Sequence, residues 1–283
     1  MSSVPFTKME AVGNDFVLVD GRRLPGLDWP ALAVAMCRRR VGIGADGLLV
    51  LLPSAVADVR MRMFNPDGTE DHCGNGLRCV SVYYVRHQGT GPTADLLVET
   101  NAGTRAAHVF RQDGVPMVRV EMGSPGLHPE EIPARFTGDT VVDRPLDVQG
   151  REVRVTSVSV GTAHTVIFAP ESAWAGDFEA LSPAVEHHQA YPERTSVLWT
   201  DASDPSRLRV RIWERGVGET LGCGTGACAV AVAARLRSRD AAFPDAVDVV
   251  SAGGTLRVEW DGRGPIYLTG PAHEVYHGEW RQS

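Results

Sequence analysis

Apolar and polar residues alternate along two stretches of this chain that resemble each other. In residues 58–63, and again in residues 207–212, every second residue is apolar and arginines stand between them. A period of two is typical of a strand with one buried face. Apolar runs of the same kind predict further strands at 46–52, 96–99, 117–122, 153–168, 248–250 and 255–260.

Two stretches that follow cysteines have helical spacing instead. After Cys73, the residues Leu77, Val80 and Tyr84 mark a single apolar stripe. Residues 227–234, which follow Cys223, would form a helix that is apolar on every side. A helix of that second kind is expected to be enclosed by a sheet.

A third helix is predicted over residues 28–40. Asp28 can cap its first turn, Pro30 suits that turn, and Gly42 follows its end. The three arginines at 38–40 are then interpreted as the cationic last turn of this helix.

The chain contains the same arrangement twice. Each arginine-bearing strand leads to a cysteine, Cys73 or Cys223, which precedes a Gly-rich turn and a helix. A turn suited to a hairpin follows each helix, at 101–104 and at 252–255. Chance similarity among Gly-rich turns is the alternative, and the matching offsets weigh against it. We therefore predict an α+β fold of two homologous, pseudo-symmetric domains, each a mixed or antiparallel sheet wrapped round a central helix.

Composition narrows the class of protein. A chain of 283 residues can form two domains, and its net charge of −7, without any basic cluster, argues against a nucleic-acid partner. No apolar stretch has the length of a membrane span, and residues 1–5 do not read as a secretory signal. Five cysteines do not suggest a disulfide framework, so a reducing cytoplasm is the expected location.

Two thiols at helix N-termini suggest acid–base chemistry. A helix N-terminus is expected to lower the pKa of a thiol, and its unpaired N–H groups bind carboxylates. If Cys73 and Cys223 faced each other across an inter-domain cleft, an amino acid held there could lose its α-proton to one sulfur. The other sulfur would return a proton from the opposite side, which inverts the carbon.

Other interpretations of these cysteines stay open from the residues alone. Cys73 and Cys223 could form a disulfide, although a cytoplasmic setting would make it an oxidised, inactive form. The spacing of Cys73 and Cys79 does not match a zinc site, and no phosphate-binding motif is present. We expect Cys37, Cys79 and Cys228 to be buried structural residues.

The signatures around both cysteines resemble those of the diaminopimelate epimerase family. Residues 65–69 with 73–79 are similar to its first signature, and residues 214–220 with 223–228 to its second. Further matches lie at 13–16, 42–47 and 269–272. The family inverts amino-acid α-carbons without pyridoxal phosphate or a metal, so the resemblance implies no cofactor, an amino-acid substrate, a cytoplasmic enzyme and a homodimer.

The resemblance also implies domain bounds and residue roles. One domain would comprise residues 1–123 with 269–283, and the other residues 124–268. Cys73 and Cys223 would be the acid–base pair. The substrate's α-carboxylate would bind at Gly74, Asn75, Gly224 and Thr225, and its other end at Asn14, Asn65, Glu214 and Arg215.

Two substrate-binding positions depart from the family pattern. Thr162 and Ser196 stand where the family usually has asparagines that recognise the distal carboxylate and amine of diaminopimelate. A hydroxyl offers fewer hydrogen bonds than an amide. The sequence therefore leaves two candidate substrates, diaminopimelate and another amino acid. The alternatives to an epimerase are an amino-acid-binding or redox-switch protein without turnover, and a non-epimerising isomerase on the same scaffold.

Overall fold

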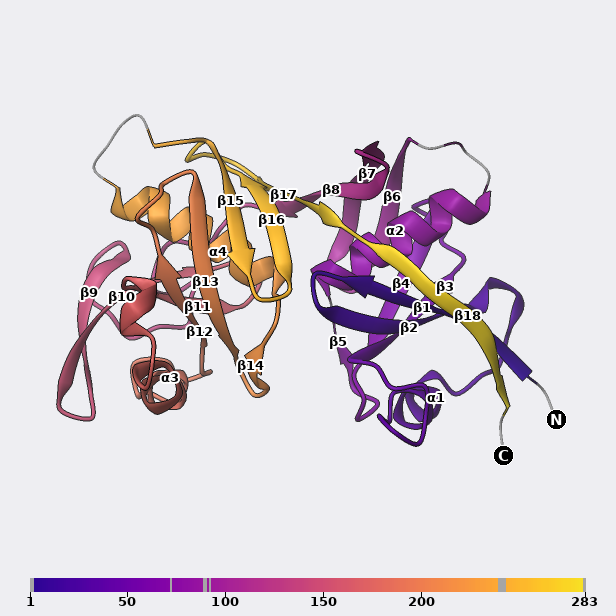
Figure 1. Cartoon of the computed structure of the whole chain (residues 1–283), viewed down its shortest axis with the longest axis horizontal. Helices are drawn as coiled ribbons and strands as arrows, with labels where there is room; N and C mark the ends of the chain where they lie inside the picture. Colours follow the sequence, from indigo (N-terminus) through magenta and orange to yellow (C-terminus); the bar gives the residue numbers. More distant parts are fainter. Residues whose placement is uncertain (1–2, 72, 89–90, 92, 239–242, 282–283) are drawn as a thin grey trace. The chain divides into compact units, whose positions relative to one another are not determined.

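The computed structural model describes residues 3–71, 73–88, 91, 93–238 and 243–281, which fold into two compact units (Figure 1). The first unit comprises Met1–Glu121 and Thr269–Ser283, and the second Met122–Leu268. The chain passes between them in strand β8 (Val115–Gly123) and again in β17 (Ile266–Pro271).

The first unit is built on one mixed sheet. Its strands are β1 (Ser3–Ala11), β2 (Asn14–Asp20), β3 (Gly47–Leu52), β4 (Val59–Phe64), β5 (Glu70–Asp71), β6 (Ala94–Thr100), β7 (Gly103–Gln112), β8 and β18 (His273–Arg281). They pair in the order β18-β1-β2-β3-β4-β6-β7-β8, with the short β5 paired to β4. Its helices are η1 (Gly21–Arg23), α1 (Trp29–Met36) and α2 (Gly74–Gln88).

The second unit repeats this plan. Its strands are β9 (Val141–Val148), β10 (Arg151–Ser159), β11 (Ala163–Phe168), β12 (Ser196–Asp201), β13 (Arg207–Glu214), β14 (Gly218–Thr220), β15 (Ala246–Ser251) and β16 (Gly254–Glu259). They pair in the order β9-β10-β11-β12-β13-β15-β16, with the short β14 paired to β13. Its helices are η2 (Glu171–Ala173), α3 (Asp177–Glu186) and α4 (Gly224–Arg237).

The strand directions match between the units. From β1 to β7 in one and from β10 to β16 in the other, successive pairs alternate antiparallel, parallel, antiparallel, parallel, antiparallel. The duplicated, sheet-rich α+β fold predicted from the sequence is therefore confirmed.

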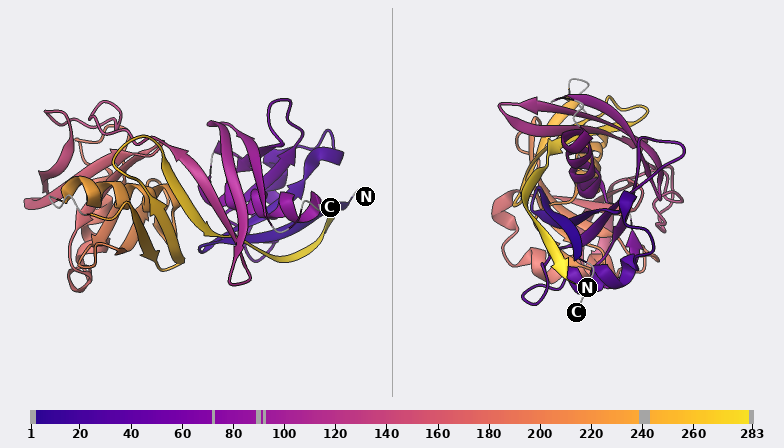
Figure 2. Two further views of the ribbon diagram at one scale, coloured as in Figure 1. Left: turned by 90° about the horizontal axis from the view of Figure 1, so that it is seen from above. Right: turned by 90° about the vertical axis from the view of Figure 1, so that its right-hand side faces the viewer.

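One long helix packs against each sheet. Helix α2 contacts strands β1, β3, β4, β6 and β7, and in the right-hand view of Figure 2 it lies inside the curve of its sheet. Helix α4 contacts β10, β11, β12, β13 and β16 of the second unit. Every residue of α4 from Gly226 to Ala234 is buried, as its all-round apolar sequence predicts.

Helix α1 is shorter than predicted. Asp28 caps it as expected, since its carboxylate accepts the Ala31 amide at 3.1 Å. The helix ends at Met36, whose carbonyl accepts the amides of Ile43 and Gly44 at 2.9 and 3.0 Å. The interpretation of residues 38–40 as its last turn is therefore wrong. The loop that follows the helix folds back, and its amides bind the Met36 carbonyl that would accept a hydrogen bond within a longer helix.

The stretch 153–168 is also not one strand. It forms the hairpin β10–β11, with the turn at 160–162. Helix α3, which contains Pro183, was not predicted from the sequence.

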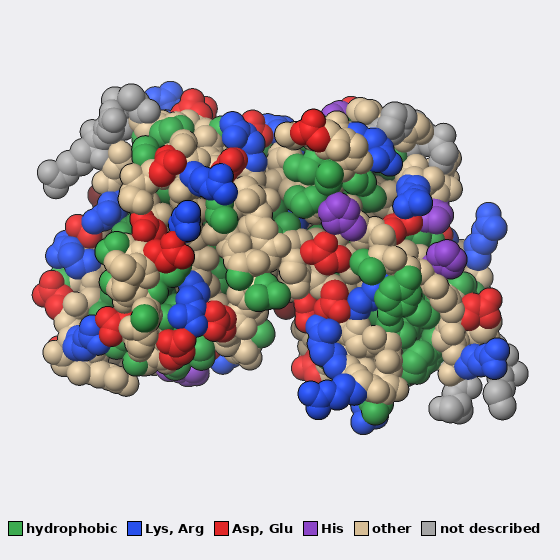
Figure 3. Space-filling model, viewed as in Figure 1, with side chains coloured by type: hydrophobic (Ala, Val, Ile, Leu, Met, Phe, Trp, Pro, Cys, Tyr) green, Lys and Arg blue, Asp and Glu red, His purple; other side chains and the backbone are tan. Residues whose placement is uncertain are grey.

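Acidic and basic side chains are interspersed over much of the face that Figure 3 shows. Within the described part of the chain, no helix is both long enough and apolar enough to cross a membrane.

Candidate active site

Cys73 lies directly before the first turn of α2 and is half-buried. The amide of Gly76 donates to its sulfur at 3.3 Å, and the amide of Leu77 donates to its carbonyl oxygen at 2.9 Å. A Cβ at position 76 would come within 2.7 Å of a methyl group of Leu49, so glycine allows the helix to begin against β3. The sulfur of Cys73 therefore caps the helix N-terminus.

Cys223 has the same relationship to α4. It is the N-cap residue, its sulfur accepts the amide of Gly226 at 3.4 Å, and its carbonyl accepts the amide of Ala227 at 2.9 Å. The hydroxyl of Thr225 lies 3.4 Å from the same sulfur. Each unit thus presents one half-buried thiol at the start of its central helix.

The pKa of Cys223 is not lowered by its helix, contrary to the sequence-based expectation. Burial raises the pKa of this thiol well above its usual value, and the nearby carboxylate of Glu214 raises it further. Hydrogen bonds from Thr225 and Gly226 act in the opposite direction but are the smaller influence. Cys223 therefore holds its proton at neutral pH.

The remaining cysteines are buried away from the helix N-termini, as expected. Cys37, Cys79 and Cys228 are each at most 2% exposed. Burial raises the pKa of Cys37 to about 12, and it also raises the pKa of Cys79 well above its usual value. All three residues therefore lie in the protein core, as expected of structural cysteines.

Two of the predicted substrate-binding residues of the first unit contact each other. The side-chain amide of Asn75 donates to the side-chain oxygen of Asn14, although the two are far apart in sequence. Arg78, which is fully buried, donates to the Asn75 oxygen at 2.9 Å. Asn14 in turn donates to the carboxylate of Asp46 at 3.1 Å, and Arg39 donates to that carboxylate at 2.7 Å. The two asparagine amides are therefore held between a cation and a carboxylate.

Asn65 has a local partner instead. It follows β4 and is half-buried, and its side-chain amide donates to the Thr69 hydroxyl at 3.0 Å within the turn 65–69. Its backbone amide donates to the carbonyl of Thr69 at 2.8 Å. The described contacts thus fix the turn that carries Asn65 but do not link it to Asn14 or Asn75.

In the second unit, Ser196 and Arg215 are in direct contact. The hydroxyl of Ser196, at the start of β12, accepts the backbone amide of Arg215 at 3.1 Å. The guanidinium of Arg215 donates to the carbonyl of Glu193 at 3.1 Å. The neighbouring Glu214 accepts the hydroxyl of Thr220 at 2.5 Å.

Thr162 lies at the turn between β10 and β11 and is half-buried. Its carbonyl accepts the Nδ1 proton of His164 at 2.8 Å. His164 is 1% exposed, and its pKa is lowered to about 4, chiefly by burial and to a smaller extent by the charge of Arg215, although the hydrogen bond to Thr162 acts in the opposite direction. His164 is therefore neutral at physiological pH, in keeping with a structural role.

Both helix starts can hold an anion. Gly74 and Asn75 begin α2, and Gly224 and Thr225 begin α4. The first backbone N–H groups of a helix point outward without an acceptor inside the helix, and they favour a carboxylate. Among the residues that the structure describes, no cluster of three or more His, Cys, Asp or Glu side chains could hold a metal ion.

Three residues that bind the predicted site residues or the segments next to them were assigned no role from the sequence. Arg78 lies inside the first cysteine signature and Asp46 inside the Gly-rich stretch 42–47, so both had a visible signal but no assigned role. Glu186, which accepts the backbone amide of Gly216 at 2.8 Å, had none, since the helix that carries it was not predicted.

Comparison with known sequences places these features in context. The sequence profile of the diaminopimelate epimerase family matches residues 6–128 and 156–275. A diaminopimelate epimerase of Desulforudis audaxviator is 48% identical over 97% of this chain and 98% of its own length. One of Moorella thermoacetica is 46% identical with the same coverage.

Solved structures share the fold at low sequence identity. A phenazine biosynthesis protein of the PhzF family from Bacillus anthracis matches the whole of both chains with a TM-score of 0.71 and 20% identity. A hydroxyproline epimerase from Agrobacterium vitis, solved with bound trans-4-hydroxy-L-proline, matches 99% of this chain and 91% of its own with a TM-score of 0.68 and 17% identity.

Proposed function

This chain belongs to the diaminopimelate epimerase family and is an isomerase, and on that premise we propose that it inverts an amino-acid α-carbon with Cys73 and Cys223 as its acid–base pair. A single observation carries this proposal. Each half of the chain places a half-buried thiol at the same point, directly before the first turn of its central helix.

The proposed reaction moves one proton in and one proton out. A thiolate removes the α-proton from one face of the carbon, and the other thiol donates its proton to the opposite face. Because Cys223 holds its proton at neutral pH, it is the donor when Cys73 is the thiolate. The sulfurs end in exchanged protonation states, and the reverse reaction begins from there. No cofactor or metal takes part in this scheme.

The first-turn amides would stabilise the negative charge that forms next to the departing proton. We assign the α-carboxylate of the substrate to Gly74 and Asn75 of α2 and to Gly224 and Thr225 of α4. Hydrogen-bond donors directed at developing charge are each worth about 10²- to 10³-fold in rate. Asn14, which contacts Asn75, is assigned to the other end of the substrate.

The distal end of the substrate is assigned to Asn65, Thr162, Ser196, Glu214 and Arg215. A guanidinium binds both oxygens of a carboxylate, so Arg215 suits a second acidic group. Diaminopimelate carries such a group, and relatives that are 46–48% identical over almost the whole chain bear its name. We therefore propose diaminopimelate as the substrate.

A second candidate is another amino acid that reacts at the same two sulfurs. It is favoured by Thr162 and Ser196, which stand where the family usually has asparagines. The hydroxyl of Ser196 already accepts the backbone amide of Arg215, and this leaves it one proton to donate to a ligand. A distal end with fewer acceptors than diaminopimelate would suit that site.

Isotope exchange with a panel of amino acids tests the proposal. The reduced protein is incubated in D₂O with diaminopimelate, lysine, histidine, arginine, ornithine and glutamate, and deuterium at Cα is followed with the configuration. If diaminopimelate alone shows exchange with inversion, the first candidate is supported. If a different amino acid of the panel does so, the second candidate is supported. Binding without exchange, together with reversible oxidation of the two thiols, would instead identify a binding or redox-switch protein.

A further inference from the structure

Glu186 is a buried carboxylate to which the proposed chemistry assigns no role. It is the last residue of α3, and its side chain is only 4% exposed. A buried carboxylate is costly to desolvate unless hydrogen-bond donors surround it. Its partners therefore show what this group holds in place.

The two oxygens of Glu186 bind donors on both sides of Arg215. One accepts the backbone amide of Gly216 at 2.8 Å, and the other accepts the indole N–H of Trp213 at 2.8 Å. Gly216 has a φ of +76°, a left-handed turn that glycine adopts readily. Glu186 thus spans the end of β13 and the turn after it, and Arg215 lies between the two contact points.

The same carboxylate reaches the segment that carries Ser196. The guanidinium of Arg194 lies 3.5 Å from the oxygen that binds Gly216. Glu193 and Ser196 flank Arg194 in this segment, and both bind Arg215, one through its carbonyl and one through its hydroxyl. One buried carboxylate therefore joins the two segments to which the distal end of the substrate is assigned.

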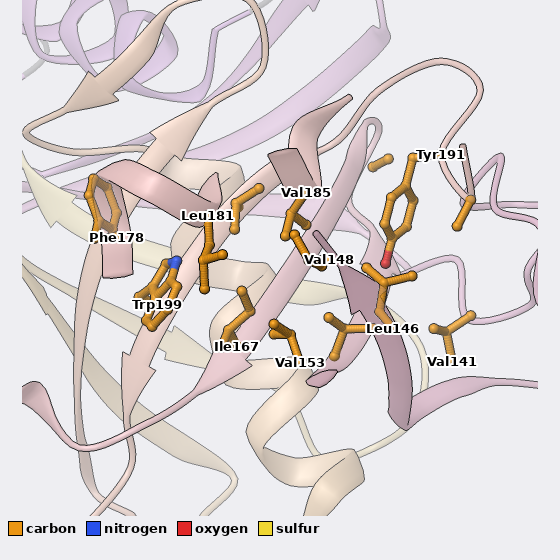
Figure 4. Packing of buried hydrophobic residues seen from close by; sticks show 14 of the residues in the cluster. Val141, Leu146, Val148, Val153, Ile167, Phe178, Leu181, Val185, Tyr191 and Trp199 are labelled. Carbon is orange, nitrogen blue, oxygen red and sulfur yellow. The ribbon is translucent and has the colours of Figure 1, made fainter. Parts of the chain in front are cut away.

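Helix α3, which carries Glu186, packs tightly against the sheet of its unit. Phe178, Leu181 and Val185 are at most 3% exposed and pack in one apolar cluster with Trp199 of β12, as Figure 4 shows. The indole of Trp199 also donates to the hydroxyl of Ser182 at 3.1 Å. The helix end that carries Glu186 is thereby fixed to the sheet.

We propose that Glu186 is a positioning residue that sets Arg215 for the distal carboxylate of the substrate. The inference rests on the function proposed above. A carboxylate is needed because both of its oxygens face N–H donors, whereas a glutamine would turn its own NH₂ group toward one of them. The expected loss therefore lies in substrate binding and not in proton transfer.

Steady-state kinetics of Glu186→Gln with diaminopimelate test this role. Loss of one hydrogen bond to the loop should raise KM about tenfold and leave kcat within about twofold of the wild type, because binding of the distal carboxylate is the same in ground and transition states. Glu179→Gln, which changes an exposed carboxylate of the same helix, should have wild-type KM and kcat.

A second variant keeps the test valid if Glu186→Gln is unstable. Trp213→Phe removes the indole donor and leaves a smaller aromatic ring in its place, so its KM should also rise, and the double variant should lose less than the sum of the two. A purely structural Glu186 would lower the unfolding midpoint and the active fraction while KM stayed unchanged, and that result would overturn the inference. Wild-type protein that does not epimerise diaminopimelate would refute the proposed substrate and this inference together.

Discussion

The side-chain amide of Asn75 donates a hydrogen bond to the side-chain oxygen of Asn14. Arg78 donates to the Asn75 oxygen, and Asp46 accepts from the Asn14 amide. A cation at one end and a carboxylate at the other leave each amide only one favourable orientation. The orientation of both side-chain amides near the start of α2 is thereby fixed by the protein itself.

Substitution of Asn75 should separate stability from activity. In Asn75→Ala the buried guanidinium of Arg78 loses an acceptor, which should lower the free energy of unfolding by about 1–3 kcal/mol. In Asn75→Asp the acceptor for Arg78 is retained while the donor to Asn14 is lost. We therefore expect near-wild-type stability for Asn75→Asp but a fall of about tenfold in kcat/KM. Urea denaturation and initial rates check both values, and equal stability of the two variants would contradict the account.

The two proposed acid–base thiols should be indispensable. Cys73→Ala and Cys223→Ala should each abolish inversion, because the opposite face of the carbon then has no proton donor or acceptor. Cys37→Ala changes a buried thiol at the C-terminal end of α1, not at a helix N-terminus, and should keep most of the activity. Polarimetry or chiral chromatography of the product measures this, and turnover in either of the first two variants would refute the assignment.

Glu214 should control the ionisation of Cys223. Its carboxylate raises the pKa of this thiol, so Glu214→Gln should lower it. In a Cys73→Ala background, the pH midpoint for alkylation of Cys223 by iodoacetamide should then move to lower pH. Glu219→Gln, an exposed carboxylate in the next strand, serves as the control and should leave the midpoint in place. A midpoint that stays fixed or rises in Glu214→Gln would rule out this electrostatic coupling.

His164 should make the fold sensitive to acid. Its pKa is lowered to about 4 in the folded protein, whereas an unperturbed histidine titrates near pH 6.5. The unfolded chain therefore takes up the proton first, and stability that is present above pH 6.5 is lost as the pH falls toward 4. The contribution amounts to about 3 kcal/mol. Unfolding free energies measured across this range should decline less steeply in His164→Asn, and parallel slopes would argue against a neutral buried histidine.

The duplicated architecture could be predicted from the sequence because its signals are local. Alternating strands, Gly-rich turns and the apolar helix after Cys223 depend on residue spacing alone. The end of α1 was predicted wrongly because a loop from residues 42–45 takes its last hydrogen bonds, and such a return of the chain leaves no periodic pattern. Helix α3 was missed for a similar reason, since its sequence, interrupted by Pro183, is stabilised by packing against β12.

Candidate site residues could be identified from the sequence where a motif contained them, but the groups that surround each side chain could not. The spacing around Cys223 indicated a helix N-terminus, but the direction of its pKa shift depends on burial and on Glu214, which only the folded chain brings near. The partners of Asn14 and Arg215 lie far from them in the sequence, namely Asp46 for Asn14 and Ser196 for Arg215. Contacts of that kind require the three-dimensional structure.

The central claim is that two thiols act on opposite faces of one carbon, and deuterium wash-in tests it most directly. A single diaminopimelate stereoisomer is incubated with the reduced enzyme in D₂O, and the reaction is stopped at low conversion. The account predicts deuterium at the inverted carbon of the product and protium in the recovered substrate, because the group that removes the proton is not the group that returns one. Deuterium that enters the recovered substrate as fast as the product would contradict it.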